Sequence, residues 1–301
     1  MSCPMKKILL LTDFSAASRH AIHYAQALFN DAAVEFCLFY AYPLLPDVLY
    51  NASFLLTAEQ REAEGQLDRY VAELTQLGIP AHHTYRTMAF PGGPVGAVEA
   101  VLNRERFDVV VLGATGSGRH EWLGSVATGV VRQIKTSVLV VPAKAPIGPV
   151  RRMVLATDCA PLPRADFLRP LKGLAAWKGA ELTLLTVENP QTVAGSFEQD
   201  AHRNTRRHLL RYFATVQTDV YVVHDEDPMH GINTYLDTHS VDLLVAVPHH
   251  TGWLDQLRGR SLTRTLAYQP RVPLLTLYQP TTDSGKTKPD KAQPATQPTS
   301  D

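Results

Sequence analysis

The sequence predicts an α/β protein of two tandem domains, each a five-stranded parallel sheet with helices on both faces. One observation is a repeat: KKILLLTDFS at 6–15 returns as RRMVLATDCA at 151–160, with basic residues, an apolar run and Thr-Asp in the same order. The other is that short apolar runs alternate with longer helical patterns. Strands that are apolar on both faces and separated by helices are typical of parallel β-α-β units.

The repeat continues in the same order through both halves. FDVVVLGATG at 107–116 recurs as VDLLVAVPHH at 241–250, and SVLVVP at 137–142 recurs as PLLTLY at 273–278. We therefore predict one domain over 1–146 and a second over 147–279, joined near the linker KAPIGP at 144–149. The segment 280–301 has almost no apolar residue and is predicted to be a disordered tail.

Each element of the first domain follows from its pattern, in chain order. Apolar runs predict strands at 8–12, 34–41, 82–88, 108–112 and 138–141. Segments with helical spacing of apolar residues fill the intervals and predict helices at 16–30, 58–76, 94–104 and 126–135.

The second domain repeats this plan without about a dozen residues after its second strand. Its predicted strands are 153–157, 182–187, 220–224, 243–247 and 274–277, and its predicted helices are 164–178, 197–215, 230–238 and 262–268. The extra residues of the first domain include YPLLPDVLYNASFLL at 42–56, which is apolar enough to pack as a lid or as an interaction surface.

Bulk properties narrow the class of protein. The 301 residues carry 29 basic and 29 acidic side chains, so no nucleic-acid or membrane surface is indicated. Cys3, Cys37 and Cys159 lack paired spacing and are predicted to be reduced thiols in the cytoplasm. Asp13 ends the first apolar run too early for a signal peptide or a membrane span.

The strongest local signal is DVVVLGATGSGRHEWLGSVATGVVRQI at 108–134, where a strand runs into four glycines at 113, 116, 118 and 124 before a helical pattern. A strand, a flexible loop and a helix N-terminus in this order predict an anion cradle. A Rossmann glycine fingerprint would follow the first strand of its unit, and a Walker loop needs Gly-Lys-Ser/Thr, which the sequence lacks.

In these residues the chain resembles the universal stress proteins, in tandem two-domain form, over about residues 5–279. Nucleotide-binding members of that family carry Gly-x2-Gly-x9-Gly-Ser/Thr after the fourth strand. Here Gly113-x2-Gly116 leads to Gly124-Ser125 across only the seven residues 117–123. The opening KKILLLTDFS and the last-strand ending LVVP are two further matches.

The resemblance implies a Rossmann-like fold of the adenine nucleotide alpha hydrolase type. It also implies ATP as the cofactor, with magnesium carried on the phosphates as an option. No catalytic residue and no metal ligand is assigned. Tandem members pair their domains through the last strands, here 138–141 against 274–277, and association of two chains into a homodimer stays open.

The same resemblance assigns ligand contacts residue by residue. Asp13 would reach the adenine or ribose side, and the backbone of Ala41 would face the base. Backbone N–H groups around the glycines and the helix start would cradle phosphate, because they lack Cβ obstruction and the helix dipole favours anions. The residues of this cradle are Gly113, Gly116, Gly124, Ser125 and Val126.

Structural alternatives accompany these assignments. Asp13 could simply cap the first helix, and Ser125 is expected to cap its own helix with or without phosphate. The glycines could serve only a tight turn. His120 in the shortened loop has no identifiable partner acid or nucleophile, so a catalytic role is not assigned to it.

The second half lacks the glycines. Val247 and His250 stand where the first half has Gly113 and Gly116, and Arg260 and Ser261 stand in place of Gly124 and Ser125. We predict that this half is degenerate for ATP despite Asp158. His249, His250, Arg258 and Arg260 form either a basic loop in solvent or a site for another anion.

Three functions follow. The favoured one is a stress-response binding and signalling module, whose first domain binds ATP with little or no turnover and whose second domain is a structural partner, acting on an unknown protein partner. A slow ATPase is the enzyme alternative, although no Walker lysine or water-positioning base is identifiable. A ligand-free interaction scaffold follows if the short loop has closed the site.

Overall fold

A computed structural model describes residues 5–43, 52–76, 78–115, 124–157, 165–190, 196–247 and 271–279. The first half contains, in chain order, β1 (Lys6–Leu11), α1 (Ala16–Leu28), β2 (Val34–Tyr42), α2 (Ala52–Gln76), β3 (His83–Pro91), α3 (Pro94–Leu102), β4 (Val109–Gly113), α4 (Ser125–Gln133) and β5 (Ser137–Val141). All nine elements were predicted. The largest error is α2, which begins six residues before the predicted start at 58, inside the segment 42–56.

The second half repeats the order. It contains β6 (Arg152–Thr157), a short 3-10 helix (Asp166–Leu168), α5 (Arg169–Lys178), β7 (Glu181–Glu188), α6 (Ser196–Tyr212), β8 (Thr218–His224), α7 (Pro228–Thr238), β9 (Leu243–Ala246) and β10 (Leu274–Thr276). The predicted helix at 262–268 and the predicted tail at 280–301 lie outside the described residues.

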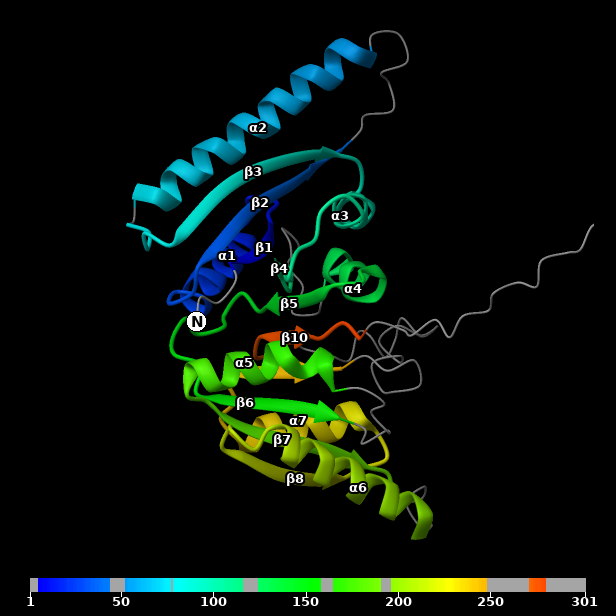
Figure 1. Cartoon of the computed structure of the whole chain (residues 1–301). Helices are drawn as coiled ribbons and strands as arrows, with labels where there is room; N and C mark the ends of the chain where they lie inside the picture. Colours follow the sequence, from blue (N-terminus) through cyan, green and yellow to red (C-terminus); the bar gives the residue numbers. More distant parts are fainter. Residues whose placement is uncertain are drawn as a thin grey trace, which may run out of the picture.

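The sequence predicts a five-stranded sheet in each half, and this prediction does not include the joining of the two sheets. The two halves share one ten-stranded sheet, in the order β3-β2-β1-β4-β5-β10-β9-β6-β7-β8 (Figure 1). Neighbours within each half are parallel, and the pair β5 and β10 is antiparallel. The predicted pairing of the last strands is therefore confirmed, and it fuses the two sheets into one.

The β5–β10 junction has an approximate two-fold symmetry that the repeat makes visible. Leu139 pairs with Leu275, and these two leucines occupy equivalent positions in the two repeats. On either side, Val140 pairs with Leu274 and Val138 pairs with Thr276, so each strand meets the other as a symmetric partner would. This self-complementary register is the arrangement that a two-fold dimer of single domains would use.

Helices cover both faces of the sheet, as predicted. On one face, α1, α2, α5 and α6 contribute to one apolar cluster that runs through both halves. On the other face, α3 and α4 pack on the first half and α7 packs on the second. Alternate residues of β1 serve the two faces, because Ile8 and Leu10 belong to the first cluster and Leu9 and Leu11 to the second. None of the helices within the described ranges is long and apolar enough to cross a membrane.

One buried side chain bears on the prediction of reduced thiols. Cys37 lies fully buried in β2 as a free thiol, and burial raises its pKa to about 12, so this thiol is chemically inert. Cys3 and Cys159 lie outside the described residues.

His83 anchors the start of β3 and makes the fold sensitive to acid. Its Nε2 donates to the Phe29 carbonyl over 3.1 Å, whereas its buried Nδ1 has no partner among the described residues. Burial lowers the pKa of His83, although the Phe29 carbonyl opposes this shift, and the neighbouring His82 lowers it further. The unfolded chain therefore binds a proton at higher pH than the folded chain does.

We expect this difference to appear as a loss of stability once the pH falls below about 6.5, the usual histidine pKa, with no contribution above it. Urea unfolding of the wild type and of His83→Gln at pH 7.5 and 5.5 measures the effect. The variant should lose less stability between the two pH values. An equal acid loss in both proteins would show that His83 does not carry it.

Candidate functional site

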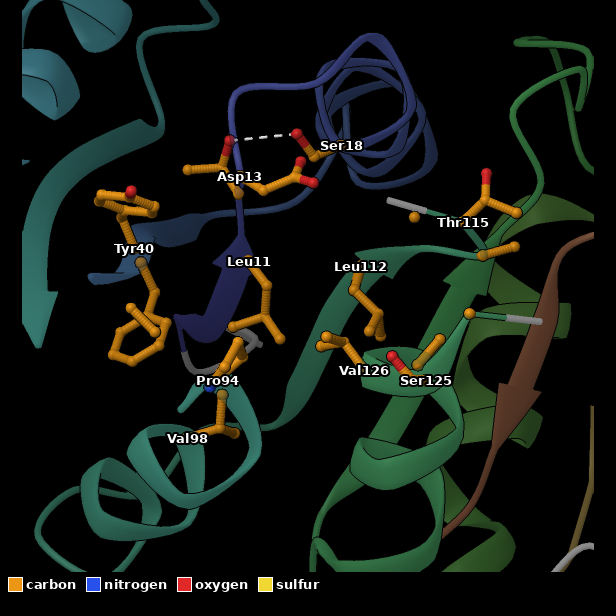
Figure 2. Close-up of a pocket in the computed structure, with 17 residues that line it drawn as sticks. Leu11, Asp13, Ser18, Tyr40, Pro94, Val98, Leu112, Thr115, Ser125 and Val126 are labelled. Atoms are coloured by element: carbon orange, nitrogen blue, oxygen red, sulfur yellow. Dashed lines mark hydrogen bonds between the residues drawn. The ribbon is translucent and has the colours of Figure 1, made fainter. Parts of the chain in front are cut away.

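The candidate site is a pocket at the carboxyl edge of the first half, where strand order reverses. The chain passes from β1 to β2 and β3 on one side, and later returns to β4 on the other side of β1. Ligands of open α/β sheets bind at such switch points. A pocket of about 370 Å³ opens there, within the size range of small-molecule sites (Figure 2).

Six of the seven predicted ligand residues line this one pocket. They come from four places in the chain: the turn after β1, the end of β2, the end of β4 and the start of α4. They are Asp13, Ala41, Gly113, Gly124, Ser125 and Val126. The seventh, Gly116, lies outside the described residues, as do His120 and the rest of the loop 116–123.

The pocket has two chemically different sides. In Figure 2, Asp13 and Tyr40 lie on one side, Thr115 and Ser125 lie on the opposite side, and Leu112 lies between them. The first side offers a carboxylate and a phenol, and the second offers hydroxyls beside the start of a helix. Such a pocket suits an elongated ligand with a donor-rich end and an anionic end.

Sequence reasoning missed several of the lining residues. Thr12 and Thr115 follow strands and Tyr40 lies near the end of one, so listing the residues around each strand's carboxyl end would have found them. Pro94, Val98 and Ser18 come from helices, and no motif marks them. They line the pocket because α3 and α1 begin at the same edge of the sheet.

Hydrogen bonds from Ser15, two residues further along the chain, hold the Asp13 carboxylate. Its Oδ1 accepts from the Ser15 hydroxyl over 2.5 Å and from the Ser15 amide over 3.1 Å. Partial burial would raise the pKa of Asp13, but the hydrogen bonds from Ser15 and Ser18 outweigh it and lower the pKa below its ordinary value. The carboxylate is therefore an ionised acceptor that is already oriented, and a poor base.

The alternative in which Asp13 caps the first helix is wrong. The N-cap of α1 is Ser15, whose hydroxyl accepts from the Ser18 amide over 3.2 Å. Ser18 in turn bonds to Thr12 through their hydroxyls over 3.2 Å, the contact that the dashed line at Ser18 marks in Figure 2. Because Ser15 caps the helix, the exposed Asp13 side chain has no capping role in α1.

The expectation that Ser125 caps its helix is also wrong. The N-cap of α4 is Gly124, which has no side chain to accept from the first amides, and Ser125 is the first helical residue. The Gly124 amide donates to the Ala114 carbonyl over 2.7 Å and closes the loop between them. The start of α4 therefore stays beside Thr115 in the pocket, despite the short connection, and its first-turn amides have no partner within the helix.

Gly113 has a packing role that the sequence did not suggest. A Cβ at this position would lie 3.1 Å from backbone atoms of Ala17 in α1 and 3.2 Å from the Thr115 carbonyl. Glycine thus suits this position, because α1 passes close over the end of β4 and leaves little room for a side chain. This close approach brings the Asp13 turn to the same pocket as α4.

The described residues that line the pocket suit the binding of a ligand with an apolar ring. Leu11, Phe39, Val98 and Leu112 supply apolar walls that suit a planar ring. Asp13 and Tyr40 are the ionisable side chains among the lining residues that the structure describes, so no lysine, arginine or histidine faces the ligand from this part of the chain. The described ranges likewise contain no group of three or more His, Cys, Asp or Glu side chains placed to hold a metal.

The equivalent edge of the second half differs in two described residues. Glu35 and Glu181 hold equivalent pairing positions, so Val187 in β7 stands where Ala41 stands in β2, and Glu188 stands where Tyr42 stands. Glu188 pairs with Arg206 of α6, and His202 Nδ1 lies 3.6 Å from its carboxylate. The larger side chain of Val187 thus occupies the position that Ala41 holds in the first half, and a charged side chain follows it. Val247, in place of Gly113, is buried.

The remaining predictions for this half cannot be compared with the structure. Asp158, His249, His250, Arg258, Arg260 and Ser261 lie outside the described residues.

Comparison with known proteins connects this geometry to a family. Residues 4–142 match the model of the universal stress protein family. A universal stress protein from Archaeoglobus fulgidus has a similar structure, with a TM-score of 0.69 and 16% identity over 91% of this chain and 99% of that chain. A functionally unknown protein from Pseudomonas aeruginosa gives a TM-score of 0.60 at 11% identity, over 91% of this chain and 92% of that chain.

Both structures extend over the two halves, so the whole architecture is shared with them, and at this identity the shared property is the fold. Among proteins of curated function, none matches this sequence.

Proposed function

Because residues 4–142 form a domain of the universal stress protein family, we propose that the pocket of this half binds an adenine nucleotide, with ATP as the favoured ligand. The protein is then a nucleotide-responsive binding module of a stress response, with little or no turnover. The second half serves as a structural partner through β10.

The observation that supports this proposal is the convergence of complementary groups on one pocket. An oriented carboxylate, apolar walls and an uncapped helix start lie around a single cavity at the switch point. The carboxylate of Asp13 suits donor groups of the ribose or the adenine. The amides at the start of α4 suit phosphate oxygens, because they carry partial positive charge and have no partner within the helix.

The charge pattern favours binding over hydrolysis. Asp13 is ionised and engaged with Ser15, and its lowered pKa makes it a weak base for activating water. Any Mg²⁺ that accompanies ATP would be held mainly by phosphate oxygens and water. A slow ATPase remains the second candidate, and phosphate release above that of a binding-deficient variant would favour it.

The amide of Ser125 provides a direct test of the cradle. Proline is favoured at the first helical position, and Gly124 has φ −63° and ψ 159°, which the residue before a proline adopts readily. Ser125→Pro should therefore keep α4 and remove one N–H donor. We expect ATP affinity to fall roughly tenfold to a hundredfold, the loss of one hydrogen bond to a charged group, while adenosine affinity changes less than about threefold.

Isothermal titration with adenosine, AMP, ADP and ATP, with and without Mg²⁺, measures these affinities. Ser125→Ala is the matched control, because it removes the hydroxyl and keeps the amide, and it should bind ATP more nearly as the wild type does. Equal losses for adenosine and ATP in Ser125→Pro would place the phosphates elsewhere. Absence of binding by the folded wild type would favour the ligand-free scaffold.

A further inference from the structure

The residue after Asp13 has an unusual backbone. Phe14 has φ of 60°, the left-handed region, and it is the one non-glycine residue with positive φ among those that the structure describes. For a bulky side chain this conformation is unfavourable, and it persists only where the surroundings hold it. Such outliers collect at functional sites, and this one lies directly beside the pocket carboxylate.

Contacts on every side of Phe14 hold it in place. Its amide donates to the Thr12 hydroxyl over 2.9 Å, and its carbonyl accepts from Arg19 Nε over 3.4 Å. Its ring packs edge-on against Tyr40 with centroids 4.8 Å apart, and against Tyr70 of α2 with centroids 6.3 Å apart. The turn is therefore clamped between β2, α1 and α2.

Arg19 connects this turn to α2. Its guanidinium lies 4.2 Å from the centre of the Tyr70 ring, and its Nη1 is 2.7 Å from Glu73 Oε2. Tyr70 is only 2% exposed whereas the Arg19 side chain is 39% exposed, so the guanidinium covers the ring at the edge of the buried core. One side chain thus bonds the strained carbonyl and packs on the helix that covers this face.

We propose that Arg19 and Tyr70 act as positioning residues, which hold Phe14 in the left-handed conformation and so aim the Asp13 carboxylate at the donor groups of the ligand. This inference rests on the proposed nucleotide site and adds that α2 is coupled to it. Asp13 and Ser15 flank Phe14, and the bonds between them require the chain to reverse at Phe14. If Phe14 relaxes to negative φ, the carboxylate loses Ser15 and turns away.

We call the contacts that Arg19 and Tyr70 make around Phe14 the clamp. The variant Arg19→Lys tests it without changing the charge of the side chain. Lysine lacks the Nε donor and the planar group that stacks on Tyr70. Glu73→Gln is the matched control, because it removes the outer partner of Arg19 and leaves both Phe14 contacts in place. Phe14→Gly is a second variant, since glycine adopts positive φ without strain but makes no ring contacts.

The first readout needs no ligand. Carboxyl NMR titration gives the pKa of Asp13, which the bonds from Ser15 help to lower. Arg19→Lys and Phe14→Gly should raise this pKa toward the ordinary aspartate value, and Glu73→Gln should leave it near that of the wild type. An unchanged pKa in both Arg19→Lys and Phe14→Gly would overturn the clamp.

The second readout is selectivity. ATP is compared with three analogues, which lack the 2′-hydroxyl, the 3′-hydroxyl and the adenine amino group in turn. The analogue that the wild type binds more weakly than ATP, but that Asp13→Asn discriminates against less, is the one whose rejection depends on Asp13. In Arg19→Lys the discrimination against that same analogue should fall roughly threefold to tenfold, the worth of one misplaced hydrogen bond. A uniform loss for all four nucleotides would show a merely structural role and overturn the proposal.

The two readouts separate the failure of this inference from that of the proposed function. If the wild type binds none of the nucleotides, the proposed function fails, whereas the pKa of Asp13 still decides whether the clamp exists.

Discussion

Replacing Leu139 and Leu275 by alanine is expected to cost about 2–5 kcal/mol for each single substitution. The two losses should also be coupled by about 0.5–3 kcal/mol in the double variant. Both side chains are buried, at 1% and 6% exposed, and they pair at the centre of the β5–β10 junction. Each alanine leaves a cavity beside the other leucine, so the second substitution acts on an environment that the first has already changed.

Equilibrium urea unfolding of the four proteins in the cycle gives the coupling. Leu184 in β7 is the matched control: it is fully buried in the same apolar cluster, but two strands separate β7 from β10 and three separate it from β5. Its alanine variant should therefore add to Leu139→Ala within about 0.5 kcal/mol. Additive losses for Leu139 and Leu275 would contradict the pairing of the two halves at this position.

The same junction indicates how the second half contributes to the first. Because β5 and β10 are antiparallel, the carboxyl edges of the two half-sheets face opposite directions, and every residue that lines the pocket belongs to the first half. The contact of the second half with the elements of the pocket therefore runs through the sheet, from β10 to β5. The Val141 carbonyl of β5 accepts from Ala114 over 2.8 Å, and Ala114 lines the pocket.

Most of the fold could be predicted from the sequence because the strand segments are apolar at consecutive positions, as burial on both faces requires. The runs around Ile8 and Val110 are apolar at consecutive positions, which is a pattern that a parallel sheet between two helical layers requires. The start of α2 was misplaced because apolar residues at 53–56 fit a packed segment as well as a helix. The single continuous sheet depends on pairing between repeats, which only the family resemblance suggested.

The sequence predicted which segments meet at the site, but the predicted helix caps within it were wrong. Asp13, Ala41 and Gly124 could be placed at one edge because Asp13 follows a predicted strand, Ala41 ends one and Gly124 lies just before a predicted helix. Helix caps were misassigned because TDFS offers several candidate caps, and the choice depends on backbone angles. The left-handed Phe14 and its contact with Arg19 have no signal in the sequence, since Phe14 is an ordinary residue of a strand-to-helix turn and Arg19 an ordinary residue of the first turn of α1.

Gly113→Val is expected to damage both the fold and the site. The new Cβ would lie 3.1 Å from the backbone of Ala17, and a backbone cannot give way as a flexible side chain can. Overpacking of this kind costs about 1–3 kcal/mol or more. The N-terminus of α1 must move away, and the Asp13 turn moves with it, so we also expect nucleotide binding to be lost.

Urea unfolding and ATP titration of Gly113→Val measure the two effects together. Gly65→Ala in α2 is the control, because nothing lies within 4 Å of the added methyl group and the change should stabilise the helix by about 0.5–1 kcal/mol. Val247 holds the equivalent position in the second half, where β6 ends at Thr157 and α5 begins at Arg169, a longer interval along the chain than the one between β1 and α1. If Gly113→Val keeps full stability and binding, the glycine is not what brings α1 to the pocket, and the difference between the two halves must arise elsewhere.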